Sequence, residues 1–126
     1  DDSISTIPEA VIAALKSLGR VDILLLGGFD RGISYDKLAT YIPQSGLRKI
    51  LLTGPAGKRI HGMLLEAGVE SAKISFFERF DDMVRQAIEV AGFGDVVLMS
   101  PGASSYDQFK NFEERGEHFK EIIASN

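Results

Sequence analysis

Short runs of Val, Ile and Leu recur along this chain and are separated by longer segments with the apolar spacing of helices. The runs contain few polar residues, so each predicted strand needs cover on both of its faces. A mostly parallel sheet with helices on both faces meets that requirement. We therefore predict one domain of 126 residues with a Rossmann-like α/β fold. The strands are expected at Val21–Leu26, Leu47–Leu52, Ile74–Phe77 and Asp95–Met99.

The first predicted helix has a clear start signal. Thr6 and Glu9 have the spacing of a capping box, and Pro8 is tolerated in a first helical turn. The helix should therefore begin after Thr6 and end at Leu18 or Gly19. Further helices are expected at Tyr35–Ile42, Lys58–Ala67, Asp81–Val90 and Asn111–Ile123. The last of them would present to solvent a face made of Glu113, Glu114, Glu117 and Glu121.

Composition narrows the classes of function. The absence of Cys excludes disulfides, thiolate metal sites and cysteine nucleophiles, and it fits a reducing compartment. A net charge of -4 and a pI near 5.1 disfavour a long nucleic-acid footprint but allow a small anion-binding cluster. No apolar run approaches the roughly 20 residues that span a bilayer, and the chain does not begin with the basic residues of a signal peptide. We expect a cytoplasmic monomer that binds neither nucleic acid nor membrane.

A ligand is expected at the carboxyl ends of the strands, because loops there lead to helix N-termini with unpaired N–H groups. The segment 100–112, after the last predicted strand, is dense in small hydroxyl residues. Ser105 could donate a hydroxyl hydrogen bond, and the backbone N–H of Phe112 would lie in the first turn of the last predicted helix. Together they could hold one carboxylate. On composition alone, the alternative that these serines only turn and cap the chain stays open.

Two more residues stand at predicted strand ends or helix starts. Arg31 lies in the loop Gly27–Gly32, where its fixed charge could pair with a ligand carboxylate or simply be solvated. Thr6 could cap the first helix only, or could cap it and also contact a substrate. The residues alone leave both questions open.

The segment Gly54–Arg59 superficially suggests a phosphate loop. The phosphate motif needs four residues between its glycines and a Ser or Thr after Lys, whereas here two residues separate the glycines and Arg follows Lys. We interpret the segment as a strand-to-helix turn without a nucleotide-hydrolysing centre. His61 and His118 have no paired metal ligand at productive spacing, so we interpret them as structural and predict no metal site.

Three stretches of the sequence resemble one family of ligases. Residues 100–116, SPGASSYDQFKNFEERG, closely resemble the C-terminal signature of the UDP-N-acetylmuramoyl-L-alanine:D-glutamate ligases among the Mur ligases. Residues 2–10, DSISTIPEA, resemble the segment that opens the same domain, and residues 26–32, LGGFDRG, resemble its strand-end glycine loop. The resemblance covers essentially all of the chain.

The resemblance implies the C-terminal domain of an enzyme of peptidoglycan precursor synthesis. In such ligases ATP phosphorylates the carboxylate of UDP-N-acetylmuramoyl-L-alanine, and the amine of D-glutamate attacks the acyl phosphate to form a peptide bond. The C-terminal domain supplies the amino-acid site and closes over ATP, while the central domain holds most of the ATP and Mg²⁺ contacts. The UDP-binding and ATP-binding domains would then lie outside these 126 residues, which alone would be inactive.

The resemblance also implies roles for individual residues. Thr6 and Arg31 would hold the α-carboxylate of D-glutamate. The Ser105 hydroxyl and the Phe112 backbone N–H would hold its side-chain carboxylate. Arg31 stands where some members of the family have Lys, and this difference preserves the charge.

The start of the chain would lie on the cofactor side of the domain. By resemblance, Asp2 and Ser3 would face the nucleotide or the domain hinge. Ile4 stands where some members have Lys and cannot make a charged nucleotide contact, so it is left out of the site.

Two other functions compete with the ligase domain. The chain could be a stand-alone binding module for a small anionic ligand or a protein partner, with the strand-end donors serving recognition only. A dinucleotide-binding Rossmann domain is disfavoured, because no Gly-x-Gly-x-x-Gly follows the first predicted strand.

Overall fold

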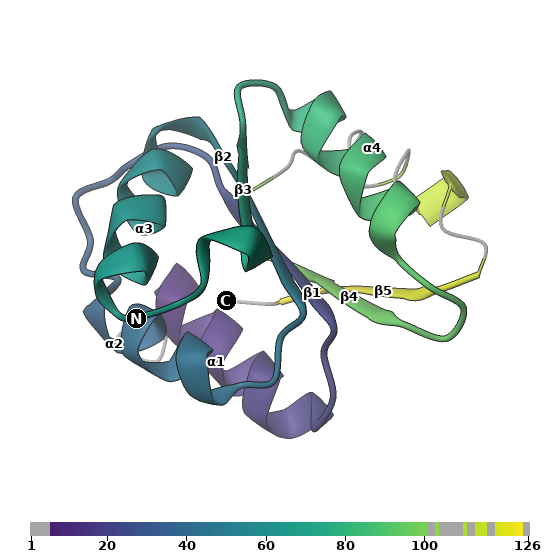
Figure 1. Cartoon of the computed structure of the whole chain (residues 1–126), viewed down its shortest axis with the longest axis horizontal. Coiled ribbons are helices and arrows are strands. Elements are labelled where there is room, and N and C mark those ends of the chain that lie inside the picture. The colour runs from purple at the N-terminus through teal and green to yellow at the C-terminus, as the bar shows by residue number, and fades with distance from the viewer. Residues whose placement is uncertain (1–5, 101–102, 104–109, 111–112, 116–117, 125–126) are drawn as a thin grey trace.

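The strands pair into one parallel sheet. The computed structural model describes residues 6–100, 103, 110, 113–115 and 118–124, and within them the sheet has the strand order β3-β2-β1-β4-β5 (Figure 1). Every neighbouring pair is parallel. The strands are β1 (Ile23–Gly27), β2 (Lys49–Thr53), β3 (Ile74–Phe77), β4 (Val96–Met99) and β5 (Lys120–Ile123). The predicted Rossmann-like α/β fold is confirmed.

Helices cover both faces of the sheet (Figure 1). They are α1 (Ile7–Leu18), α2 (Asp36–Tyr41), α3 (Gly54–Glu66) and α4 (Phe80–Val90), with short 3-10 turns η1 (Ile42–Gln44) and η2 (Ser71–Lys73). None of the helices in the described part of the chain has the length and apolarity to cross a membrane.

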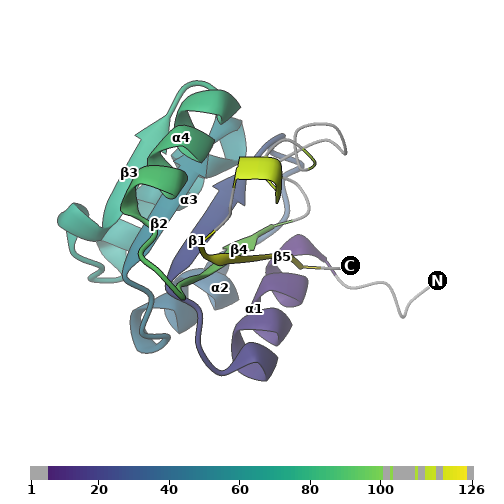
Figure 2. The same ribbon diagram turned by 90° about the vertical axis from the view of Figure 1, so that its right-hand side faces the viewer.

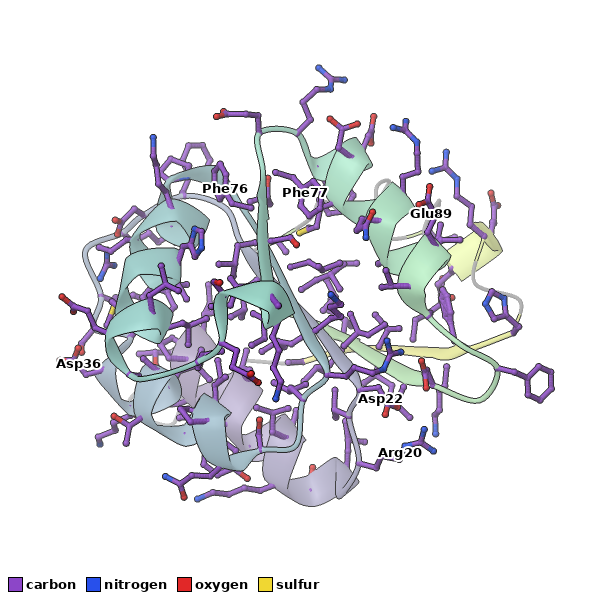
Figure 3. All side chains as sticks on the ribbon, in the orientation of Figure 1. Arg20, Asp22, Asp36, Phe76, Phe77 and Glu89 are labelled. Atoms are coloured by element: carbon purple, nitrogen blue, oxygen red, sulfur yellow. The ribbon has the colours of Figure 1, made fainter. Side chains whose placement is uncertain are left out.

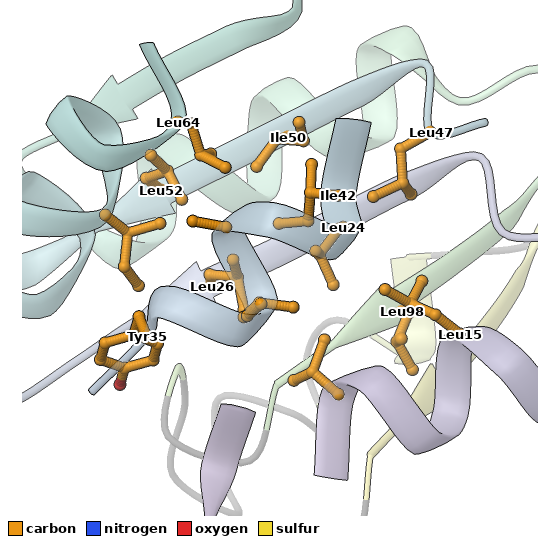
Figure 4. Close-up of a cluster of buried hydrophobic side chains, with 14 of the residues drawn as sticks. Leu15, Leu24, Leu26, Tyr35, Ile42, Leu47, Ile50, Leu52, Leu64 and Leu98 are labelled. Carbon is orange, nitrogen blue, oxygen red and sulfur yellow. The ribbon is translucent and has the colours of Figure 1, made fainter. Parts of the chain in front are cut away.

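The alternation of side chains along β1 divides the core into two layers. Leu24 and Leu26 pack with α1, α2 and α3, as Figure 4 shows, whereas Ile23 and Leu25 pack with Met83 of α4. Each of these five residues has a relative solvent exposure of 1% or less. A strand that is buried on both faces explains why these runs show no polar alternation.

The predicted capping box at the start of α1 is confirmed. Thr6 Oγ1 accepts a hydrogen bond from the Glu9 backbone N–H at 3.4 Å, and Glu9 Oε1 accepts one from the Thr6 N–H at 3.1 Å. The helix ends at Leu18, with Gly19 at its C-cap, as the sequence predicts. α1 runs opposite to the strands, so its N-terminus lies at the end of the sheet where β1 finishes (Figure 2).

α3 begins four residues earlier than the sequence predicts. The expected turn, residues 54–57, is the first turn of the helix, which starts at Gly54 and not at Lys58. The backbone N–H of Ala56 donates to the Gly28 carbonyl at 3.1 Å, so a residue far away in sequence caps this turn. Pro55 fits because a first-turn residue needs no N–H donor.

The predicted last helix, Asn111–Ile123, is wrong over its second half. Residues 113–115 are helical, but Lys120–Ile123 form β5, which pairs with β4 in the register Leu98↔Ile122. The backbone of β4 offers hydrogen-bonding groups along its free edge, and this tertiary pairing outweighs the local helical periodicity. Glu121 therefore belongs to an edge strand and does not lie on a solvated helical face.

Glu121 makes the stability of this edge dependent on pH. Glu121 pairs with Val97 in the strand register, and its Oε2 is buried without a hydrogen-bond partner among the described residues. Burial, with a smaller contribution from the Glu113 charge, raises the pKa of Glu121 to about 7. A raised pKa means that the protonated carboxyl favours the folded chain. Its stabilisation is complete below the ordinary glutamate pKa of 4.5 and is lost as the pH rises through about 7.

Glu121→Gln should therefore stabilise the domain at high pH only. We expect the free energy of unfolding to rise by about 1 kcal/mol at pH 8, allowing for solvent screening of a partly buried group, and to stay unchanged at pH 4. Urea unfolding at the two pH values measures this, with the exposed Glu89→Gln on α4 as the control. An equal effect of Glu121→Gln at both pH values would rule out the titration as its cause.

Candidate functional site

The sheet has a topological switch point between β1 and β4. These strands are parallel neighbours, and the Ser100 N–H after β4 donates to the Leu25 carbonyl of β1 at 2.9 Å. The segment after β1 leads to α2, which packs on one face, whereas Ala103 after β4 packs on the α4 face. Ligands of open α/β sheets bind beyond the carboxyl ends of two such diverging strands. The chain therefore leaves β1 and β4 side by side at the carboxyl end of the sheet.

A hollow of about 300 Å³ lies between the N-terminus of α1 and the segment that follows β1. Its lining residues are Thr6, Pro8, Glu9, Ile12, Ile33, Ser34 and Lys37. Thr6 lines the hollow itself. Arg31 is exposed and stands two positions before Ile33 in the loop that forms the opposite wall. The structure thus brings Thr6 and the residues that follow the Arg31 loop to one concave surface, whose lining does not include Arg31 itself.

The helix cap uses only part of the hydrogen-bonding capacity of the Thr6 hydroxyl. The bond from the Glu9 N–H uses a lone pair of Oγ1 as the acceptor. A hydroxyl group can accept and donate at the same time, so its hydrogen stays available for a carboxylate oxygen. The two roles that the sequence left open for Thr6 are compatible with each other.

The loop that carries Arg31 is held by an ion pair that the sequence did not reveal. Asp30 accepts two hydrogen bonds from Arg59 of α3, from Nε at 2.7 Å and from Nη2 at 2.8 Å. Asp30 Oδ1 also accepts the Gly32 N–H at 2.9 Å, and Arg59 Nη2 also donates to the Ile33 carbonyl at 2.8 Å. These bonds tie the loop to α3 both before and after Arg31. Asp30 and Arg59 are 29 positions apart, so no local motif marks the pair.

This ion pair is charged throughout the neutral pH range. The Arg59 hydrogen bonds, followed by the Gly32 N–H, lower the pKa of Asp30 to about 2. The Arg59 guanidinium also lies over the buried ring of Tyr35, 5.2 Å from its centroid. Acid therefore protonates Asp30 only well below the pH of ordinary enzyme assays.

The first turn of α3 is a poor phosphate site, as its sequence suggests. Its Ala56 N–H is already bound to the Gly28 carbonyl, and Pro55 has no N–H. An anion would have to displace a backbone bond that also positions the loop after β1. In addition, no group of three or more His, Cys, Asp or Glu side chains in the described ranges could hold a metal ion.

Charges at the opposite end of the sheet are mutually neutralised. Arg48 and Arg20 both pair with Asp95, and Asp22 accepts the Val96 N–H at 2.8 Å. The Gly92 N–H and then Arg48 lower the pKa of Asp95. Figure 3 shows Arg20 and Asp22 at this end, where β1 starts. These arginines serve to join the starts of the strands and are not available for an anionic ligand.

Four of the predicted site residues lie outside the described residues. They are Asp2, Ser3, Ser105 and Phe112. Their roles stay predictions. Within the described part of this region, Ser100 at the end of β4 is fully buried, and its Oγ has no hydrogen-bond partner among the described residues.

Three curated proteins that are similar to this chain share one name. The chain is 37% identical over 123 residues to the UDP-N-acetylmuramoylalanine–D-glutamate ligase of Caldanaerobacter subterraneus subsp. tengcongensis. It is 38% identical over 130 residues to the enzyme of that name from Acetivibrio thermocellus, and 40% identical over 119 residues to that from Halalkalibacterium halodurans. No protein-family model matches the chain.

The matches cover nearly all of this chain but only a small part of each ligase. They cover 98%, 99% and 94% of this chain but only 27%, 28% and 26% of the three ligases, so the chain spans about a quarter of the length of its relatives. The resemblance drawn from the sequence is confirmed, and the matched share is consistent with a C-terminal domain fragment.

Proposed function

We propose that this chain is the C-terminal, amino-acid-binding domain of a UDP-N-acetylmuramoylalanine–D-glutamate ligase and holds D-glutamate in cytoplasmic peptidoglycan precursor synthesis. The observation that carries the proposal is the concave surface lined by Thr6 and by Ile33, two positions after Arg31, at the carboxyl end of a Rossmann-like sheet. The name shared by relatives that cover nearly all of this chain supports the choice of substrate.

In the reaction, the domain would position D-glutamate. Arg31 and the Thr6 hydroxyl would bind the α-carboxylate of D-glutamate, while the Ser105 hydroxyl and the Phe112 N–H would bind its side-chain carboxylate. Holding both acidic ends fixes the amine between them, so that it can attack the acyl phosphate of UDP-N-acetylmuramoyl-L-alanine in line. The free amine forms the new C–N bond as the C–O bond to phosphate breaks, and the nitrogen releases one proton to solvent and keeps the N–H of the new peptide bond.

ATP and Mg²⁺ would be held mainly by other parts of the ligase. The described residues offer neither an open helix N-terminus at α3 nor a cluster of metal ligands. We therefore assign no phosphate or Mg²⁺ site to this part of the domain. Asp2 and Ser3 would approach the nucleotide or the hinge when the domain closes over it.

Arg31→Ala in the ligase that contains this sequence tests the proposal. Losing a charge-assisted hydrogen bond to the α-carboxylate should raise the KM for D-glutamate about tenfold. The KM for ATP should change little, because Arg31 would not contact ATP. The turnover at saturating D-glutamate should also change little, because Thr6 and the side-chain carboxylate contacts would still hold the bound amino acid. Steady-state kinetics with each substrate varied in turn measures this.

A matched control separates the site from general surface charge. Arg85→Ala removes an arginine that pairs with Asp82 at 2.9 Å on α4, on the other face of the sheet. It should leave the KM for D-glutamate unchanged. If Arg31→Ala behaves like Arg85→Ala, Arg31 has no part in binding and the proposed site is wrong.

A further inference from the structure

We propose that Arg59 is a positioning residue for D-glutamate, which acts through Asp30 to hold Arg31 in its binding position. The inference rests on the proposed function, because it assumes that Arg31 contacts the substrate. It assigns a role to a helix residue in a segment that the sequence identified only as a failed phosphate motif.

Hydrogen bonds from Arg59 hold the chain both before and after Arg31. Asp30, the residue before it, receives the two-pronged hydrogen bond of Arg59, and Ile33, two residues after it, receives a third bond from the same guanidinium. Asp30 closes the segment on itself by accepting the Gly32 N–H. A short arc of backbone around Arg31 is thus fixed to α3, while the Arg31 side chain is exposed toward solvent.

Little else in the composition of this loop would restrict its backbone, so the hydrogen bonds from Arg59 have a large ordering effect. Gly27, Gly28 and Gly32 all have positive φ angles, and glycine backbones lose the most conformational freedom on ordering. Phe29 is 84% exposed and so does not anchor the loop by apolar packing. Pre-ordering the loop removes that entropic cost from substrate binding, which lowers the KM without adding any contact to the substrate.

The tie depends on the shape of an arginine. The Nε and Nη2 atoms of Arg59 donate parallel hydrogen bonds to the two carboxylate oxygens of Asp30, and Nη2 also donates one to the Ile33 carbonyl. A lysine ammonium is a point charge and cannot match this fork. Arg59→Lys should therefore fail to restore full D-glutamate affinity although it preserves the charge.

The test is a double-mutant cycle in the ligase that contains this sequence. Arg59→Ala should raise the KM for D-glutamate about fivefold to tenfold, with turnover and the KM for ATP little changed, because the substrate carboxylate meets a less ordered Arg31. In an Arg31→Ala background the same change should add less than about twofold, since its effect passes through Arg31. Asp30→Asn should reproduce the Arg59→Ala effect and provides the test if Arg59→Ala fails to fold.

The outcomes separate the two proposals. If Arg31→Ala raises the KM and neither Arg59→Ala nor Asp30→Asn does, the positioning role is overturned and the proposed function stands. If Arg59→Ala raises the KM equally with and without Arg31, it acts independently, and the inference is again overturned. If Arg31→Ala itself leaves the KM unchanged, the proposed function fails. Arg85→Ala, which breaks a remote arginine–aspartate pair, should leave all these values at their original level.

Discussion

Gly27→Ala should destabilise the domain more than any other single change considered for this chain. A Cβ atom at this position would lie 2.0 Å from the Thr53 carbonyl oxygen and 2.8 Å from its carbon, with the Gly27 φ at 148°. Gly27 and Thr53 are paired in the register of β1 and β2, so neither backbone can move without breaking the centre of the sheet. We expect a loss of about 3–5 kcal/mol, which is a large part of the stability of an ordinary domain.

Urea unfolding followed by circular dichroism measures this loss, and another glycine of the same chain provides the control. Gly62 lies within α3, and a Cβ added there would meet no atom within 4 Å. Gly62→Ala should therefore stabilise the helix by about 1 kcal/mol. Similar midpoints for the two variants would show that the backbones at Gly27 and Thr53 are not locked together.

The same close approach shapes the candidate site. Gly28 donates its N–H to the Thr53 carbonyl at 3.1 Å and accepts the Ala56 N–H, so the chain leaving β1 lies directly against the start of α3. A Cβ at Gly54 would lie 2.7 Å from the Gly28 carbonyl oxygen. Because this contact brings the loop onto α3, the Arg59 side chain one turn further along the helix can reach Asp30.

The parts of the fold that depend on local chemistry could be predicted from the sequence. Buried runs of Leu and Ile identified the four strands of the core, and the Thr6 capping box identified the start of α1. Ile74–Phe77 agrees residue for residue, and the other three strands differ by one or two residues at their ends.

The parts that depend on distant contacts could not be predicted. Lys120–Ile123 has a charged, half-apolar sequence and becomes a strand only because the edge of β4 is open beside it. The bond between Arg59 and Asp30 joins two segments with no sequence pattern in common. In the candidate site, Thr6 and Arg31 were predicted together from the family resemblance, whereas the residue that holds the Arg31 loop became visible only once the backbone of Gly28 was placed against α3.

Thr6→Asp should weaken D-glutamate binding strongly without weakening the fold. Asp caps a helix N-terminus at least as well as Thr, and its charge interacts favourably with the helix dipole. The free energy of unfolding should therefore stay the same or rise by a few tenths of a kcal/mol. The new carboxylate would nevertheless stand where the α-carboxylate of the substrate is proposed to bind. Like charges at such a distance cost several kcal/mol, so we expect the KM for D-glutamate to rise about a hundredfold.

Thr6→Ser and Thr6→Val separate the cap from the substrate contact. Ser keeps both the acceptor for the Glu9 N–H and a hydroxyl donor, so its KM for D-glutamate should stay within about twofold of the original. Val has neither, and its variant should lose about 1 kcal/mol of stability as well as substrate affinity. Only the aspartate variant combines an intact cap with a repelled substrate. If it is stable and its KM is also unchanged, the Thr6 hydroxyl serves α1 alone, and the α-carboxylate site must be built from other residues.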